Sequence, residues 1–265
     1  MARALVALLI LLLAGTTIAA PPLVTIADGP ALLLRDTGRY LLAEGVKLQA
    51  DDLIELPPQA GLLRIEFSDG SALALAPGSR ALILPRLAGE PLAYLLQGWA
   101  KLDAPPKGQA LLALSGFDAG TSGHAVIAVA GERAFAEAGE LLLRRASAPP
   151  LKLKPGEFVA AAASEKARPV ARPAPEFLRQ LPREFQVSLP ARAARFAGKE
   201  REPKRSGELT PADLLPWMEA SDPLLRQALL PRWRALAQQS EFRAALRQYP
   251  ELERILGHAS AAPKH

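Results

Sequence analysis

The sequence predicts a mainly β fold, followed by a proline-rich linker and a small C-terminal helical segment. From residue 23 to about residue 163, short apolar runs are separated by Gly, Pro or Asp, with a turn signal roughly every eight to twelve residues. This spacing is typical of a domain built from many short strands. The near absence of helix-length amphipathic runs in this region supports the same interpretation. A sandwich, a barrel and an irregular β-solenoid or roll all fit the pattern.

One stretch shows the strand-turn-strand pattern most clearly. Apolar and charged side chains alternate over residues 63–67, which predicts a strand with one buried and one wetted face. Asp69 and Gly70 then predict a tight turn, because Gly accepts a positive φ and the Asp side chain can bond its own backbone. Alternation resumes in residues 72–75 and stops at Pro77.

Several motifs in this region resemble the FecR domain family. They comprise an acidic pair before a strand, a Phe-x-Asp-Gly-Ser corner, a Leu-Leu-Gln-Gly step and two later Gly-Glu turns. Physically these positions are structural, since glycines and aspartates set corners between strands. The turn and motif positions are Asp51, Asp52, Phe67, Asp69, Gly70, Ser71, Gly98, Gly139 and Gly156.

The resemblance to the FecR family implies a β-rich, solenoid-like domain exposed to the periplasm or the outside. The best-known members are inner-membrane regulators that relay receptor occupancy to a sigma factor, through a cytoplasmic segment that precedes a membrane span. Here a predicted signal peptide stands in that place, so we do not extend sigma-factor regulation to this chain.

Residues 1–20 are expected to form a secretory signal peptide. Arg3 is followed by an apolar core of roughly a dozen residues and then by small residues, with cleavage expected after Ala20. The alternative is an uncleaved anchor, but a spanning helix needs about 20 apolar residues and this core is shorter. We therefore expect a periplasmic or secreted protein that starts at Pro21 and is not inserted in a membrane. The sequence contains no Cys, which excludes disulfides and thiol catalysis.

The first folded domain is expected over residues 21–163, and residues 164–207 change character. This segment holds eleven Lys or Arg against five Asp or Glu, together with many prolines. Such a composition predicts an extended, solvated linker with a short docked piece near Phe177 or Phe185 and a disordered stretch at residues 192–205. Nucleic acid is not an expected partner of an exported protein.

Helical signals begin after residue 208 and run to residue 257, before an expected disordered tail at residues 258–265. Thr210, Pro211 and Asp213 form a helix-start signal, and further starts are expected at Asp222-Pro223, Ser240 and Pro250. Pro231 is expected to interrupt or kink the second helix. This region either packs on itself or on the β-domain, or folds on a partner.

The sequence nominates no catalytic, cofactor-binding or metal-binding residue. Its three histidines have no cluster of other ligands at metal-site spacing, and no cofactor is implied. Tyr94 and Trp99 are candidates for a binding surface for polysaccharide or peptide, with burial in the core as the alternative.

We therefore expect an exported, non-enzymatic FecR-like interaction or scaffold module of the bacterial cell envelope, with an envelope protein or a cell-wall polymer as its partner. One alternative is a periplasmic signal-sensing component that acts with a membrane regulator. A second is a hydrolase with an unrecognised site, for which an acid such as Asp118 would be the residue to test.

Overall fold

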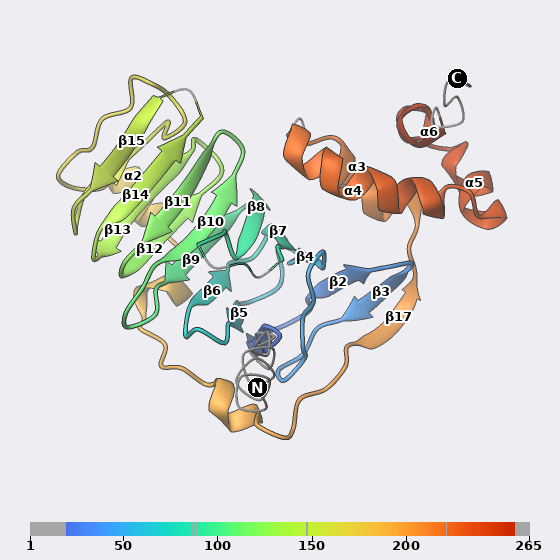
Figure 1. Cartoon of the computed structure of the whole chain (residues 1–265), viewed down its shortest axis with the longest axis horizontal. Helices are drawn as coiled ribbons and strands as arrows, with labels where there is room; N and C mark the ends of the chain where they lie inside the picture. The colour runs from blue at the N-terminus through green and yellow to red at the C-terminus, as the bar shows by residue number, and fades with distance from the viewer. Residues whose placement is uncertain (1–19, 86, 88, 147, 221, 258–265) are drawn as a thin grey trace, which may run out of the picture.

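The fold is mainly β, with two sheets packed face to face and a group of helices at one side (Figure 1). The computed structural model describes residues 20–257 except 86, 88, 147 and 221. The expected signal peptide, apart from Ala20, and the expected tail at residues 258–265 lie outside the described residues. No helix in the described ranges is long and apolar enough to cross a membrane.

One sheet has seven strands and the other has ten. In spatial order the seven-stranded sheet consists of β1 (Leu23–Ala27), β5 (Leu63–Glu66), β6 (Ala72–Leu75), β9 (Trp99–Asp103), β12 (His124–Ala128), β13 (Arg133–Ala138) and β16 (Phe158–Val159). The ten-stranded sheet consists of β15 (Ala148–Leu153), β14 (Leu141–Arg145), β11 (Phe117–Thr121), β10 (Ala110–Leu114), β8 (Ala93–Gln97), β7 (Arg80–Ile83), β4 (Leu53–Glu55), β2 (Leu32–Arg35), β3 (Gly38–Leu41) and β17 (Lys204–Glu208).

The chain moves from one sheet to the other after nearly every hairpin, so strands that neighbour each other are often distant in sequence. Neighbouring strands in both sheets are antiparallel, except that β8 and β10 are parallel with β9 in the other sheet between them. The sheets are not closed into a barrel. These pairings do not confirm a solenoid of repeating turns, which stays a prediction.

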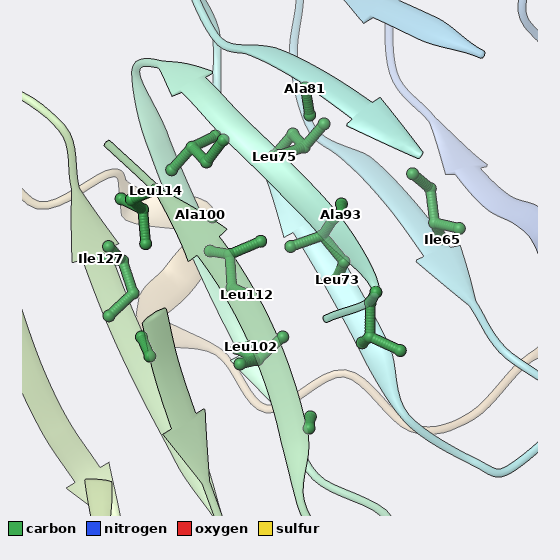
Figure 2. Close-up of a cluster of buried hydrophobic side chains, with 14 of the residues drawn as sticks. Ile65, Leu73, Leu75, Ala81, Ala93, Ala100, Leu102, Leu112, Leu114 and Ile127 are labelled. Carbon is green, nitrogen blue, oxygen red and sulfur yellow. The ribbon is translucent and has the colours of Figure 1, made fainter. Parts of the chain in front are cut away.

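The main core lies between the two sheets and is built from Leu, Ile and Ala (Figure 2). Leu73 and Leu75 of β6 face Leu112 of β10 across it, and all three are fully buried. Each fully buried Leu contributes about 1.5–3 kcal/mol relative to an exposed one. The alternation of apolar residues in the sequence therefore does place one face of these strands inside.

A second apolar cluster joins the outer face of the ten-stranded sheet to four helices. Leu34, Leu53 and Leu82 of the sheet pack there with Trp217 and Trp233 of the helical region. The helices are α3 (Pro211–Met218), α4 (Pro223–Leu236), α5 (Ser240–Leu246) and α6 (Pro250–Gly257).

The helix-start signals in the sequence are confirmed. Thr210 and Asp213 form the capping box of α3, with the Thr210 N–H donating to Asp213 Oδ2 at 2.8 Å. Of the two outcomes expected at Pro231, the interruption is wrong, since α4 runs through this residue, and the kink stays a prediction. Burial of one face against the sheet outweighs the lost hydrogen bond, because tertiary packing supplies most helix stability in proteins.

Residues 164–207, which we call the strap, cross the outer face of the seven-stranded sheet. Its elements are α2 (Pro175–Gln180), the short 3₁₀-helices η1 (Arg183–Gln186) and η2 (Ala193–Phe196), and finally β17, which pairs with β3. In Figure 1 the strap runs from α2 at the left along the lower left and the bottom, and then rises at the right as β17 towards the helices. The docked piece expected near Phe177 or Phe185 is confirmed, since both side chains are buried against the sheet. The disordered stretch expected at residues 192–205 is wrong, since η2 and the start of β17 lie within it.

Gly98 and Gly156 allow a test of how much the corners depend on glycine. Both have φ near the same positive value, +88° and +86°, which costs a residue with a side chain about 1–2 kcal/mol. A Cβ at Gly98 would lie 2.3 Å from Ser79 Oγ, whereas one at Gly156 would meet no atom within 4 Å. We expect Gly156→Ala to lower the free energy of unfolding by about 1 kcal/mol and Gly98→Ala by about 3 kcal/mol or more. Urea denaturation followed by circular dichroism checks this, and equal losses would contradict it.

Candidate functional site: the strap-covered face of the seven-stranded sheet

The register of β5, β6, β9 and β12 brings four ionisable residues together on the outer face of the seven-stranded sheet. Asp103 on β9 is directly opposite His124 on β12, with His124 Nδ1 2.8 Å from Asp103 Oδ1. Ala74 on the intervening strand β6 is small, so Arg64 Nη1 can reach Asp103 Oδ2 at 3.0 Å. Arg64 Nε also lies 3.3 Å from Glu66 Oε1. Three strands thus share one ion-pair network.

This face was expected to be wetted, and that expectation is wrong. Arg64 and Glu66 are only 5% and 6% exposed, because the strap lies over them. The Glu66 carboxylate accepts hydrogen bonds of 2.9–3.0 Å from the backbone N–H groups of Arg192 and Ala193, and one of 3.0 Å from the Thr25 hydroxyl. Strand alternation shows which side chains share a face, but not what covers that face.

The surroundings of Glu66 favour its charged form. Burial raises the pKa of the Glu66 carboxyl, but the N–H groups of Ala193 and Arg192, the Thr25 hydroxyl and the Arg64 charge outweigh that effect, so the pKa is lowered from its ordinary value. A carboxylate that receives several hydrogen bonds is a strong anchor for a backbone segment. The ionised carboxylate of Glu66 is therefore the form that holds the strap.

Lys101 provides a second polar anchor. Its ammonium group donates a 2.6 Å hydrogen bond to the backbone carbonyl of Phe185 and lies 2.7 Å from Glu137 Oε2. Because its side chain is 9% exposed, the charge needs both partners to compensate for lost solvation. Lys101 thus fixes η1 through the backbone rather than through a side chain.

Two aromatic side chains of the strap complete its attachment. Phe177 and Phe185 are both buried, in a cluster with Ala74, Ala76 and Val126 of the sheet. These small residues leave room for the rings, and full burial of each ring contributes about 1.5–3 kcal/mol.

Trp99, one of the two candidate surface aromatics, lies half-buried at this attachment. Its ring centroid is 5.3 Å from that of Phe177, and the Arg133 guanidinium carbon is 5.0 Å from the Trp99 ring centroid. Trp99 thus packs against the strap and is not presented as an open platform for a sugar or a peptide.

Beside η1, the strap and the sheet enclose a groove of about 290 Å³. It is lined by Arg64, Lys101, Asp103, His124 and Glu137 from the sheet and by Glu184–Leu189 from the strap. We call this the charged groove. It offers charges of both signs together with backbone groups, an arrangement suited to binding a polar polypeptide segment. Among the described residues no group of three or more His, Cys, Asp or Glu could hold a metal ion.

The Phe-x-Asp-Gly-Ser motif forms the corner between β5 and β6. The Phe67 N–H donates to the Ser71 carbonyl at 2.9 Å, and the Ser71 N–H donates to Asp69 Oδ1 at 2.9 Å. Gly70 has a φ of +88° and donates its N–H to the Phe67 carbonyl at 3.0 Å. The structure gives these residues contacts within the turn, away from the charged groove.

Asp51 and Asp52 lie at a different corner, next to the ten-stranded sheet. Asp51 has a φ of +68°, and Arg232 of α4 donates to its carbonyl at 2.7 Å. Asp52 is buried and forms two hydrogen bonds of 2.7 Å with Arg35, while the Gln49 N–H donates to it at 2.7 Å. Burial raises the pKa of Asp52 against the opposing effect of Arg35, and the hydrogen bond to Asp52 raises the pKa of Arg35.

The remaining motif glycines are corner residues in the same sense. Gly139 has a φ of +69°, and a Cβ there would lie 2.8 Å from the Gly123 nitrogen. Gly98 sits against Ser79, and Gly156 donates its N–H to the Ala136 carbonyl at 2.7 Å. None of the three lines the charged groove.

Tyr94, the other candidate surface aromatic, is buried beneath the helical region. It is 4% exposed, and its hydroxyl donates to Asp222 just before α4. Burial, together with the hydrogen bond to Asp222 and its charge, raises the pKa of Tyr94. Tyr94 is therefore a core residue, which was the alternative to a binding surface. Its hydrogen bond joins the helical region to the sheet.

Asp118 is placed at a different part of the molecule from the charged groove. It is on β11, directly opposite Arg144 of β14. Burial raises the pKa of the Asp118 carboxyl, and Arg144 opposes that rise.

The residues of the charged groove were missed from the sequence. Arg64 was expected on a wetted strand face, and the histidines were considered only as metal ligands. The groove residues come together only when β5, β9 and β12 are placed in order. A signal was present, since Arg64, Lys101 and His124 all occupy outward positions of strands whose alternate residues are apolar. The strand order needed to use that signal comes from tertiary structure.

No family model matches the chain, and no curated protein matches it either. Two crystal structures of a "putative anti-sigma factor" from Parabacteroides distasonis ATCC 8503 are similar to it in part. Each is 12% identical with a TM-score of 0.39, over 49% of this chain and 64% or 63% of the solved chain. The chain thus spans less than two thirds of the length of these structures. A likeness of this size carries no conclusion on activity or partners.

Replacing Glu66 tests the strap anchor. We expect Glu66→Gln to lower hydrogen-exchange protection of the Arg192 and Ala193 amides by about 1.5–3 kcal/mol, the range for hydrogen bonds to a charged group. The wild-type pKa is lowered, so the stabilisation is complete above the ordinary value of about 4.3 and is lost as pH falls through the folded pKa. After correction for the intrinsic exchange rate, protection of the Arg192 and Ala193 amides should therefore fall in acid in the wild type. In Glu66→Gln this protection should not change with pH. Glu140→Gln, in an exposed ion pair with Lys152, is the control; equal protection in both variants would contradict the assignment.

Replacing Tyr94 tests the junction between helices and sheet. Tyr94→Phe removes one donor to the buried Asp222, and we expect the helical region to lose about 1–3 kcal/mol. Urea denaturation followed by Trp fluorescence reports this, since Trp217 and Trp233 both lie in that region. Tyr40→Phe is the control, because the Tyr40 hydroxyl has no hydrogen bond recorded with a described residue. If Tyr94→Phe unfolds at the same urea concentration as the wild type, the hydrogen bond from Tyr94 to Asp222 does not stabilise the helical region.

Proposed function

We propose that this chain is an exported, FecR-like and non-enzymatic interaction module of the bacterial cell envelope, and that it binds an envelope protein at the charged groove. The observation that carries the proposal is the way in which the seven-stranded sheet already holds an extended polypeptide. Glu66 and Lys101 bind backbone groups of the strap, and two Phe rings fill apolar sites. Backbone contacts combined with side-chain pockets are a general mode of peptide recognition.

The groove beside the strap extends the same chemistry to a second chain. His124 has a side chain that is 44% exposed, so part of the ion-pair network is open to solvent. Charges of both signs would select a partner segment by electrostatic complementarity more than by apolar area. The signal peptide expected from the sequence and the FecR-like motifs support an exported, envelope location, and the proposal includes both.

The absence of Cys allows a direct test by single-cysteine photo-crosslinking. Gln186→Cys places the probe at the charged groove and Lys107→Cys places it on an exposed loop outside the groove. In the native envelope we expect one defined protein adduct from Gln186→Cys and none from Lys107→Cys. The identified partner is then purified, and its affinity should fall about tenfold for His124→Gln, as for loss of one hydrogen-bonded contact, but not for Lys107→Gln.

Two results would overturn the proposal. One is the same set of adducts from both positions, or none from either. The other is turnover of peptide or peptidoglycan substrates by the purified protein with loss of turnover in Asp118→Asn, which would establish the hydrolase alternative.

A further inference from the structure

The strap carries the positive charge of this protein. Residues 164–207 hold an excess of six positive charges, whereas the whole chain has a net charge of +5, so the rest of the chain is slightly acidic. In a solvated tether these charges would be spread through a mobile segment. In the folded chain the strap is docked, so they belong to a fixed surface.

Docking also decides which way the strap side chains point. Phe177 and Phe185 are buried against the sheet, which leaves their neighbours in α2 and η1 on the outward side. Ten of the eleven Lys and Arg of the strap are exposed, Arg192 being the exception. Arg183 and Arg195 make no ion pair with any residue that the structure describes.

The same surface exposes apolar side chains. Five large hydrophobic residues of the described chain are strongly exposed, and three of them lie on the strap: Val170 at 51%, Leu178 at 47% and Val187 at 59%. Arg179 follows Leu178 directly, and Arg183 stands one helical turn before Val187. Apolar and cationic groups are thus interleaved outside the two buried rings.

From α2 to η2, the strap surface occupies one side of the molecule. Along the strap, Phe177 contacts Phe158 of β16, Phe185 receives a bond from Lys101 of β9, and Ala193 bonds to Glu66 of β5. The strap thus crosses the seven-stranded sheet from one edge towards the other, while the helices cover the opposite side of the sandwich (Figure 1).

We propose that the outward surface of the strap docks on an anionic lipid bilayer. Cations near such a surface each add to the attraction, and apolar side chains beside them enter the boundary between headgroups and acyl chains. A soluble polyanion would use the cations but would leave Leu178 and Val187 in water. The docking is peripheral, in accord with the lack of any spanning helix in the described part of the chain. Val187 also lines the charged groove, so the two surfaces share that residue. Lipid binding and protein crosslinking are separate measurements, so either proposal can fail without the other.

The test is co-sedimentation with vesicles, using residues 21–265. Residues 1–20 are left out because their apolar core would itself bind lipid, and the folded contacts described above lie within residues 20–257. We expect binding to vesicles that contain phosphatidylglycerol, little binding to pure phosphatidylcholine, and weaker binding as salt rises from about 0.1 M to about 0.5 M.

The double variant Arg183→Gln/Val187→Ser should bind the anionic vesicles at least about tenfold more weakly. Its matched control is Lys107→Gln/Leu87→Ser, which removes the same kinds of exposed group away from the strap. Circular dichroism melting establishes that each variant is folded, and Arg172→Gln/Leu178→Ser replaces the first variant if it is not.

The proposal is overturned by any of three results. The first is no binding to anionic vesicles, and the second is an equal loss in the control variant. The third is binding that depends on charge but is unchanged by Val187→Ser alone, which would assign the surface to a soluble polyanion.

Discussion

Both outer faces of the β-sandwich carry apolar side chains, and in the described part of the chain residues 164–257 cover them. The two inner faces bury one another. The outer faces would remain in water without a cover: that of the seven-stranded sheet carries Ala74, Val126 and Phe158, and that of the ten-stranded sheet carries Leu34, Leu53 and Tyr94. The strap covers the first set and the helices cover the second. The rest of the architecture depends on this constraint, because it fixes where each later segment must lie.

Covering a sheet face with an extended segment requires directed contacts as well as apolar area. Each backbone N–H and C=O of such a segment needs a partner, since a buried unpaired group costs about 1–3 kcal/mol. Glu66 and Lys101 supply partners for the strap, one anionic for N–H groups and one cationic for a carbonyl. This explains why charged residues stand in the middle of the sheet: their side chains bind the backbone groups of the strap. The proposed binding of a partner would use the same kind of contact.

The turn chemistry and the helix starts could be predicted because their causes are local. Asp69 and Gly70 form a corner within five residues, and Thr210 and Asp213 close a capping box within four. The charged groove could not be predicted in the same way. Its members are distant in sequence, from Arg64 to His124, and their proximity depends on the order of strands that the chain reaches by alternating between sheets.

By itself the sequence determined a mainly β domain, its corners and the presence of C-terminal helices, since residue type and period act over a few residues. For residues 164–207 the sequence predicts a solvated linker with a short docked piece near Phe177 or Phe185, and only the tertiary structure decided that the docking extends to residues 192 and 193. Two Phe side chains and two buried ionisable residues on the sheet hold that segment in place. Composition cannot anticipate the two polar anchors, because Lys101 and Glu66 lie 84 and 126 residues from the strap backbone groups that they bind.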